Sequence, residues 1–284
     1  MQNNLGYRPP NGKKLFLQIS ILNGDRTGLS PYWGAKDNLP LPKPWDKYDF
    51  DSPEVKRAYL NFVLRAVDAM HPDYLAIGME NNVLLSKHAA SWKRLKALHV
   101  ETYIGVKEKH PNIPVFFTTD VLHYKKIADE AHETDQEGEV AELMKHSDLF
   151  AMSVYPHMSF SVPRPVPEDF FDFALKFGKP IAVSESGDTS RDVELKAYKV
   201  TLKGSESGQK QFTEMLLKKA EENRYEFVIT FATTDFGSLC DKMPPSARDL
   251  ARIWAYTGLQ TGERKPKPAL AVWDAYLNAS YARP

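Results

Sequence analysis

The sequence lacks most of the features that mark a special environment or a special partner. Its one cysteine, Cys240, excludes an internal disulfide and gives no support to a cysteine metal site. Lysine and arginine together number 37 and are matched by 37 aspartates and glutamates, so the charge indicates neither a nucleic acid nor a membrane surface as partner. No apolar run approaches the roughly 20 residues that cross a bilayer. No GxGxxG or Walker loop follows an apolar strand, so nucleotide binding has no support either.

The first ten residues also lack the apolar run of a signal peptide. We therefore expect a soluble protein, cytoplasmic unless an export signal lies outside this chain. Residues 1–14 are polar, contain Pro9, Pro10 and Gly12, and are expected to form an N-terminal tail.

What the sequence has is an alternation of apolar strands with amphipathic helices. The predicted strands cover 15–22, 73–80, 115–120, 148–156, 179–187 and 226–236. The predicted helices cover 53–70, 86–110, 136–146, 168–177, 208–223, 245–257 and 266–278. Strands that are apolar throughout and separated by helices indicate an α/β protein with a parallel sheet covered by helices. Polar or acidic groups at most strand ends are typical of the mouth of a (β/α)8 TIM barrel.

The count of strands is lower than a complete barrel requires. Six are visible, against eight in a TIM barrel, and the proline-rich stretch 23–50 does not read as a further strand. We predict one catalytic domain, residues 1–284, that forms an incomplete barrel of about six βα units. Because open strand edges are rarely tolerated, we expect a homodimer or the tail at 1–14 to cover them.

Two predicted strands end in an acid. The stretch 73–82 rises out of a helix end and stops at Glu80, and the stretch 179–187 carries Glu185 at the same place. Strand ends converge at a barrel mouth, so the two carboxyls are expected to face one pocket. Tyr155, at the end of another strand, is placed to donate a hydrogen bond to Glu185. Each glutamate alone could instead be a capping or ion-paired residue.

Five motifs follow one another along the chain: the aromatic, proline-rich loop with Trp33 and residues 41–45, the strand 72–80, the Ser-Val-Tyr-Pro at 153–156, the strand 181–185, and residues 267–273. In this order they resemble the clan A glycoside hydrolases, most closely the endo-β-1,4-galactanase family. The resemblance covers about 15–278 and implies a TIM barrel in which Glu80 is the general acid/base and Glu185 the nucleophile. By this resemblance the first strand here matches the third of the family, and the first two βα units are absent.

The sequence departs from the family at Met79, where an asparagine precedes the acid/base. That asparagine usually binds the substrate 2-hydroxyl, a contact that strengthens in the transition state. Either Asn81 or Asn82 takes its place, or activity is weakened. The last strand also carries no tryptophan platform.

Further residues are candidates for contact with a sugar, and each could equally serve the fold. Asn81 and Asn82 could cap a helix, Asn23 precedes a glycine as in an ordinary turn, and Trp33 and Trp45 could pack their loop. The complete set of substrate-contact candidates is Asn23, Trp33, Trp45, Asn81, Asn82, Asp120, Tyr155, His157 and Asp235.

A metallohydrolase is the rival among enzymes. Asp120, His123 and His157 lie near strand ends and could bind a metal. However, no HxH motif is present on the first strand, so our prediction contains no metal and no cofactor.

The sequence therefore predicts a retaining glycosidase that cleaves β-glycosidic bonds of an oligo- or polysaccharide by double displacement. The alternative is a relative of the same fold that binds carbohydrate and has weak or no activity.

Overall fold

The structure is a computed structural model that describes residues 9–10, 12–128 and 134–279, with only the backbone described at Ser246. It divides into two compact units, and strand β5 (Phe150–Val154) contributes residues to both. The first unit holds the described residues up to Lys126 and residues 134–152. The second holds residues 127–128 and 153–279. The expected tail at 1–14 falls largely outside the described residues, and the single catalytic domain stays a prediction.

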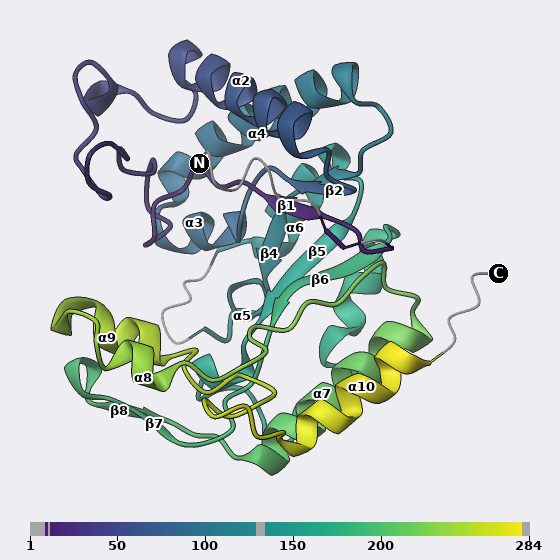
Figure 1. The fold of residues 1–284 in the computed structure, drawn as a ribbon. Helices are drawn as coiled ribbons and strands as arrows, with labels where there is room; N and C mark the ends of the chain where they lie inside the picture. The colour runs from purple at the N-terminus through teal and green to yellow at the C-terminus, as the bar shows by residue number, and fades with distance from the viewer. Residues whose placement is uncertain (1–8, 11, 129–133, 280–284) are drawn as a thin grey trace. The chain divides into compact units, whose positions relative to one another are not determined.

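The first unit alternates strands with helices along the chain (Figure 1). Its elements are β1 (Phe16–Gln18), the 3-10 helix η1 (Trp45–Lys47), α2 (Pro53–Met70), β2 (Tyr74–Ala76), α3 (Asn81–Lys87), α4 (Ala89–Lys109), β3 (Val115–Phe116), β4 (Thr118–Asp120), α5 (Val121–Tyr124), α6 (Gln136–Leu143) and the 3-10 helix η2 (Met144–His146).

The strands of this unit are parallel, as predicted. Phe16 pairs with Tyr74 in β1 and β2, and Leu75 pairs with Val115 in β2 and β3. The N–H of Asp148 donates to the carbonyl of Val115, which brings the start of β5 beside β3. β2, β3 and β5 are buried throughout, as expected for strands with helices on their outer side.

Helix α2 shows why the local sequence folds as it does. Pro53 occupies the first turn, where its missing N–H costs nothing. Val55, Tyr59 and Val63 recur on one face and are buried. The hydroxyl of Tyr59 contacts the carbonyl oxygens of Ile19 and Ile77 at 3.1 and 3.0 Å, so the helix is fixed against the ends of β1 and β2.

The second unit contains the rest of the barrel-like pattern and a small hairpin (Figure 1). Its elements are the 3-10 helices η3 (Pro156–Met158) and η4 (Glu168–Phe177), β6 (Ile181–Ser186), β7 (Val193–Leu195), the 3-10 helix η5 (Lys196–Tyr198), β8 (Val200–Leu202), α7 (Glu206–Glu222), α8 (Gly237–Cys240), α9 (Pro245–Arg252) and α10 (Pro268–Asn278). Helices α7 and α10 pack side by side.

The segment 226–231 pairs in parallel with β6, although it is not an assigned strand. The N–H of Val183 donates to Phe227, and the N–H of Ile229 donates to Val183, both at 2.9 Å. The prediction at 226–236 is therefore correct in that this segment pairs with β6. It is too long at its end, because Thr234 pairs with Gln260 and not with β6.

Other predicted boundaries need correction. The helix predicted at 86–110 is two helices, α3 and α4, separated at His88. No element was predicted between 120 and 136 or between 187 and 208. The structure places the buried helix α5 in the first of these stretches and the antiparallel hairpin β7–β8 in the second. The predicted helix 168–177 is a 3-10 helix that ends at Gly178, and the helix predicted at 245–257 ends at Arg252.

Ser52 occupies the N-cap position of α2, but its side chain makes no capping bond and instead accepts the N–H of Asp49 at 2.9 Å. Among the described helices, none combines the length and the apolar composition needed to cross a membrane.

Candidate functional site

Glu80 stands where the end of β2 turns into α3. Its backbone lies in the left-handed region, with φ 50° and ψ 44°, which is unusual for a residue with a side chain. Its N–H donates to the hydroxyl of Thr118 on β4 at 2.9 Å, and its carbonyl accepts from Val83 at 3.0 Å. Strained backbone of this kind occurs preferentially at functional sites.

The carboxylate of Glu80 forms an ion pair that the sequence did not indicate. Nη2 of Arg26 lies 2.9 Å from Oε2 of Glu80, and the two side chains are only 14% and 17% exposed. Arg26 comes from the turn after β1, at residues 23–28. Asn23, a predicted substrate contact, organises this turn, because its Oδ1 accepts the N–H groups of Thr27 and Gly28 at 2.8 and 3.4 Å.

The two asparagines after Glu80 have different surroundings. Asn82 is buried and fully used: its amide nitrogen donates to the carbonyl of Asp120 and to Gln136, and its oxygen accepts the N–H of Asp120. Asn81 is also buried, but its Nδ2 finds no acceptor among the described residues. The structure therefore gives Asn82 a scaffold position and leaves Asn81 with an unused donor.

Asp120 and His123 form a close pair at the end of β4. Oδ1 of Asp120 accepts both the N–H and the ring Nδ1 of His123, each at 2.7 Å, and thereby caps α5. Among the described residues, no group of three or more His, Cys, Asp or Glu side chains is arranged to hold a metal ion.

Glu185, near the end of β6, has the neighbour that was predicted for it. The hydroxyl of Tyr155 donates to Oε2 of Glu185 at 3.1 Å, which confirms this contact. This bond fixes the position of one oxygen of the carboxylate. Gly187 leaves the required space, because a Cβ there would lie 2.7 Å from the carbonyl oxygen of Phe231 and 3.4 Å from the Tyr155 ring.

His157 follows Tyr155 and is fully buried. Its Nε2 hydrogen-bonds the carbonyl of Ile253 at 3.0 Å, and its Nδ1 lies 3.3 Å from Oδ1 of Asp188. Arg164 holds the same carboxylate with both terminal nitrogens. Neither Arg164 nor Asp188 was singled out from the sequence.

Asp235, after the last paired segment, is held by a lysine that the sequence did not suggest. Nζ of Lys267 lies 2.7 Å from Oδ1 of Asp235, with side chains 2% and 9% exposed. Lys267 also donates to Ser190 and to the carbonyl of Gly258, both at 2.8 Å. Burial raises the pKa of Asp235 and lowers the pKa of Lys267. The pair lines an open polar pocket of about 620 Å³.

The two predicted tryptophan platforms lie on one apolar groove in the first unit. Trp33 is 74% exposed, and Trp45 packs edge-on against Tyr48 with ring centroids 5.5 Å apart. The groove is about 490 Å³ and runs between the 29–45 loop and α2, where Phe62 is exposed.

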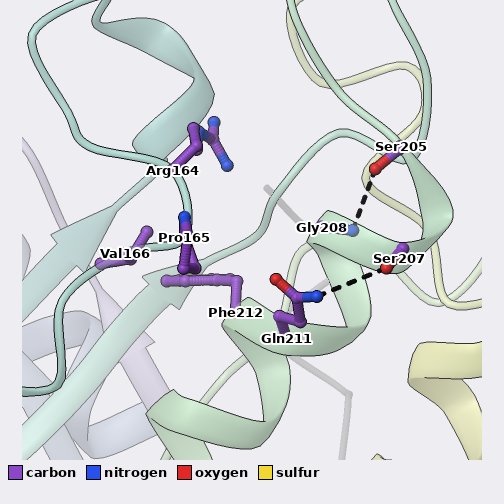
Figure 2. Close-up of a pocket in the computed structure, with 8 residues that line it drawn as sticks. All are labelled: Arg164, Pro165, Val166, Ser205, Ser207, Gly208, Gln211 and Phe212. Carbon is purple, nitrogen blue, oxygen red and sulfur yellow. Dashed lines mark hydrogen bonds between the residues drawn. The ribbon is translucent and has the colours of Figure 1, made fainter.

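A separate pocket of about 320 Å³ lies at the start of α7 and contains none of the predicted residues. Figure 2 shows Arg164 and Phe212 on its walls, with Ser205 capping the helix through the N–H of Gly208 at 3.0 Å.

A comparison with models of protein families shows which family this chain belongs to. The family model described as "Glycosyl hydrolase family 53" matches residues 30–224, a segment that contains both Glu80 and Glu185. The chain belongs to glycosyl hydrolase family 53.

Solved structures agree in fold with this assignment to family 53. The Ignisphaera aggregans GH53 catalytic domain is 20% identical, with a TM-score of 0.54, over 85% of this chain and 70% of that one. A β-glucuronidase of Bifidobacterium dentium is 14% identical, with a TM-score of 0.54, over 81% of this chain. A β-D-glucuronidase of Dictyoglomus thermophilum is 13% identical, with a TM-score of 0.53, over 86% of this chain. Family and fold together assign the chain to the (β/α)8 glycosidases, as predicted.

This family 53 chain spans 35% of the length of the Bifidobacterium enzyme and 40% of the Dictyoglomus enzyme. The comparison with curated proteins finds no match.

Proposed function

We propose that this family 53 chain is a retaining glycoside hydrolase that cleaves β-glycosidic bonds of an oligo- or polysaccharide. The observation that carries the proposal is that Glu80 and Glu185 both follow or end buried parallel strands within the matched segment 30–224. In TIM-barrel enzymes the catalytic groups come from such strand ends.

The proposed reaction uses the two carboxyls in turn. Glu185 attacks the anomeric carbon and Glu80 gives its proton to the departing oxygen, so a glycosyl-enzyme ester forms as the glycosidic bond breaks. Glu80, now ionised, takes a proton from water, whose oxygen attacks the anomeric carbon and releases Glu185. The hydrogen bond from Tyr155 supports this assignment, because it holds one oxygen of the Glu185 carboxylate in a fixed position.

The contacts to substrate remain part of the proposal. Asn81 is the better of the two asparagines for a hydroxyl contact, since its Nδ2 has no acceptor among the described side chains and backbone groups, whereas Asn82 holds β4 and Gln136. We propose that Trp33 and Trp45 stack on sugar rings, as an alternative to covering of their groove by a second chain. Asn23, Asp120, His157 and Asp235 make strong contacts within the protein, and their predicted sugar contacts stay predictions.

We also propose that the barrel has about six βα units and that a homodimer covers its open edges. Two features support association: a net charge of zero, which favours it, and the apolar groove with exposed Trp33 and Phe62.

The experiment compares Glu80→Gln and Glu185→Gln with the unchanged protein on aryl β-glycosides and plant polysaccharides. Each variant should lose activity by about 10²-fold or more on unactivated substrates. The anomeric configuration of the first product, followed by NMR, should be the β-configuration of the substrate, as expected for a retaining enzyme. Glu108→Gln and Glu221→Gln, which change exposed glutamates on α4 and α7, are matched controls and should be fully active. Unchanged turnover in both site variants would refute the proposal, and saturable oligosaccharide binding without any product would favour the binding-only alternative.

A further inference from the structure

The turn at residues 23–28 is built to place one guanidinium against Glu80. Nη1 of Arg26 donates to the carbonyl oxygens of Asn23 and Gly24 at 3.3 and 3.1 Å, and Nη2 reaches Oε2 of Glu80 at 2.9 Å. The turn is closed by the N–H of Arg26, which donates to Asn23 at 3.0 Å. The arginine is therefore anchored on its own loop and is not a mobile surface side chain that happens to meet an acid.

Both partners of this ion pair have unusual backbone geometry. Arg26 has φ 57° and Glu80 has φ 50°, so each occupies the left-handed region that residues with a Cβ rarely adopt. Such geometry persists only where the surrounding structure enforces it, and it concentrates at functional sites. Both residues of the ion pair thus have their backbone held in this region by the surrounding structure.

The pair is also poorly exposed to solvent. With side chains 14% and 17% exposed, water screens the attraction less than at an open surface. Nε of Arg26 is buried and has no acceptor among the residues that the structure describes. A buried donor without a partner is unfavourable for folding, so the sequence keeps this arginine at some cost in stability.

We propose that Arg26 is a positioning residue that fixes the orientation and the charge state of Glu80, an inference that rests on the proposed function. An adjacent guanidinium favours the ionised form of a carboxyl. It therefore assists the second step, in which Glu80 removes a proton from water. It opposes the first step, in which Glu80 must carry a proton to the leaving group.

Other charged groups lie on the elements around Glu80, and their positions or partners are as follows. Asp120 and His123, beyond Thr118 on β4, pair with each other. Asp25 lies beside Arg26 on the exposed side of the turn, and Lys87 lies at the far end of α3. Among the residues that the structure describes, Arg26 is the cation that forms an ion pair with the Glu80 carboxylate, so the test removes that charge.

The first test is the pH profile of Arg26→Gln with two classes of substrate. With an alkyl or poor phenol leaving group, the basic limb of kcat/KM should move up by about one pH unit or more, because Glu80 stays protonated to higher pH. With a dinitrophenyl leaving group, which needs no proton, that limb should not move.

A second readout is kcat for the dinitrophenyl substrate. Its acidic limb should move up in Arg26→Gln, because the base that activates water protonates at higher pH. Arg26→Lys keeps the charge and should restore part of the original profile.

The second test is a double-variant cycle in the Glu80→Gln background. If Arg26 acts through Glu80, Arg26→Gln should change kcat for the dinitrophenyl substrate, which reports the water-attack step, less than about twofold once Glu80 is gone. Independent, multiplying losses would overturn the inference, as would equal changes for both substrate classes. Arg57→Gln, an exposed arginine on α2, is the control and should leave the profile unchanged. Failure of the proposed function is recognised separately, because Glu80→Gln alone would then have no effect.

Discussion

His99 illustrates how burial alone can set the pH range of stability. The imidazole lies on α4, hydrogen-bonds the carbonyl of His146 through Nε2 at 2.8 Å, and meets the ring of Phe117 edge-on. Burial lowers its pKa to about 4, from 6.5. The unfolded chain therefore binds this proton more readily than the folded one, and the stability is complete above pH 6.5 and falls as the pH drops toward 4.

Because the unfolded chain takes up this proton first, we expect His99 to lower the free energy of unfolding by about 2 kcal/mol as the pH falls from 7.5 to 5. His99→Gln keeps a donor for the carbonyl of His146 and removes the titration, so its stability should depend less on pH by that amount. Urea unfolding of both proteins at the two pH values measures the difference. Equal pH dependence in the two proteins would contradict the assignment.

At the same scale, the sequence predicted the acids better than their partners. Glu80 and Glu185 were found because each ends an apolar run, and Tyr155 was paired with Glu185 by strand order alone. Arg26 could not be found this way, since it reaches Glu80 only through a turn with a positive φ. Lys267 lies far from Asp235 along the chain, so their pairing depends on tertiary structure.

Strands and helices were predictable where one apolar pattern dominates. β2, β5 and β6 were correctly placed because their cores are uninterrupted runs of apolar residues. The hairpin β7–β8 was missed because each strand has only three residues with a polar one in the middle, Glu194 or Thr201. Its small core consists of Val193, Leu195 and Leu202. α5 was missed because four residues are too few to show a helical period.

Lys267 makes hydrogen bonds to three segments that are far apart in the sequence. It ties the residues after β6, through Ser190, to the segment before α8 and to the carbonyl of Gly258. Lys267→Met should destabilise the protein by about 3–5 kcal/mol, because a buried carboxylate would lose its partner.

The matched variant for this pair is the double change Lys267→Met with Asp235→Asn, which removes both charges. It should recover more than half of the lost stability in urea unfolding, since an amide costs less to bury than an unpaired carboxylate. A double variant no more stable than Lys267→Met would show that packing of the lysine stem matters more than charge.

For the whole molecule, the order of strands and helices along the chain predicted the fold class. The same order did not determine whether the barrel has all eight βα units. The parallel register of β1, β2 and β3 and the family assignment agree with the predicted (β/α)8 fold. A count of six strands rests on apolar runs, and short strands such as β3, with two residues, show how little signal a strand can carry.

The proposed homodimer gives a measurable expectation at this scale. Sedimentation at micromolar concentration should give a mass near twice the 32.3 kDa of the chain. Phe62→Glu, which places a charge in the apolar groove beside Trp33, should shift the protein toward the monomer. Ile104→Glu changes an equally exposed apolar residue on α4 outside this groove and should leave the mass unchanged. A monomer at tens of micromolar would contradict the proposal.

The exposure of Trp33 has a practical consequence. Its indole is in water, whereas Trp92 is buried with 2% exposed. Aqueous quenchers such as acrylamide therefore reach one ring and spare the other. Any ligand, sugar or second chain, that covers the groove would shield Trp33 and change the emission of the unlabelled protein. The molecule thus carries its own fluorescent reporter for whatever occupies that face.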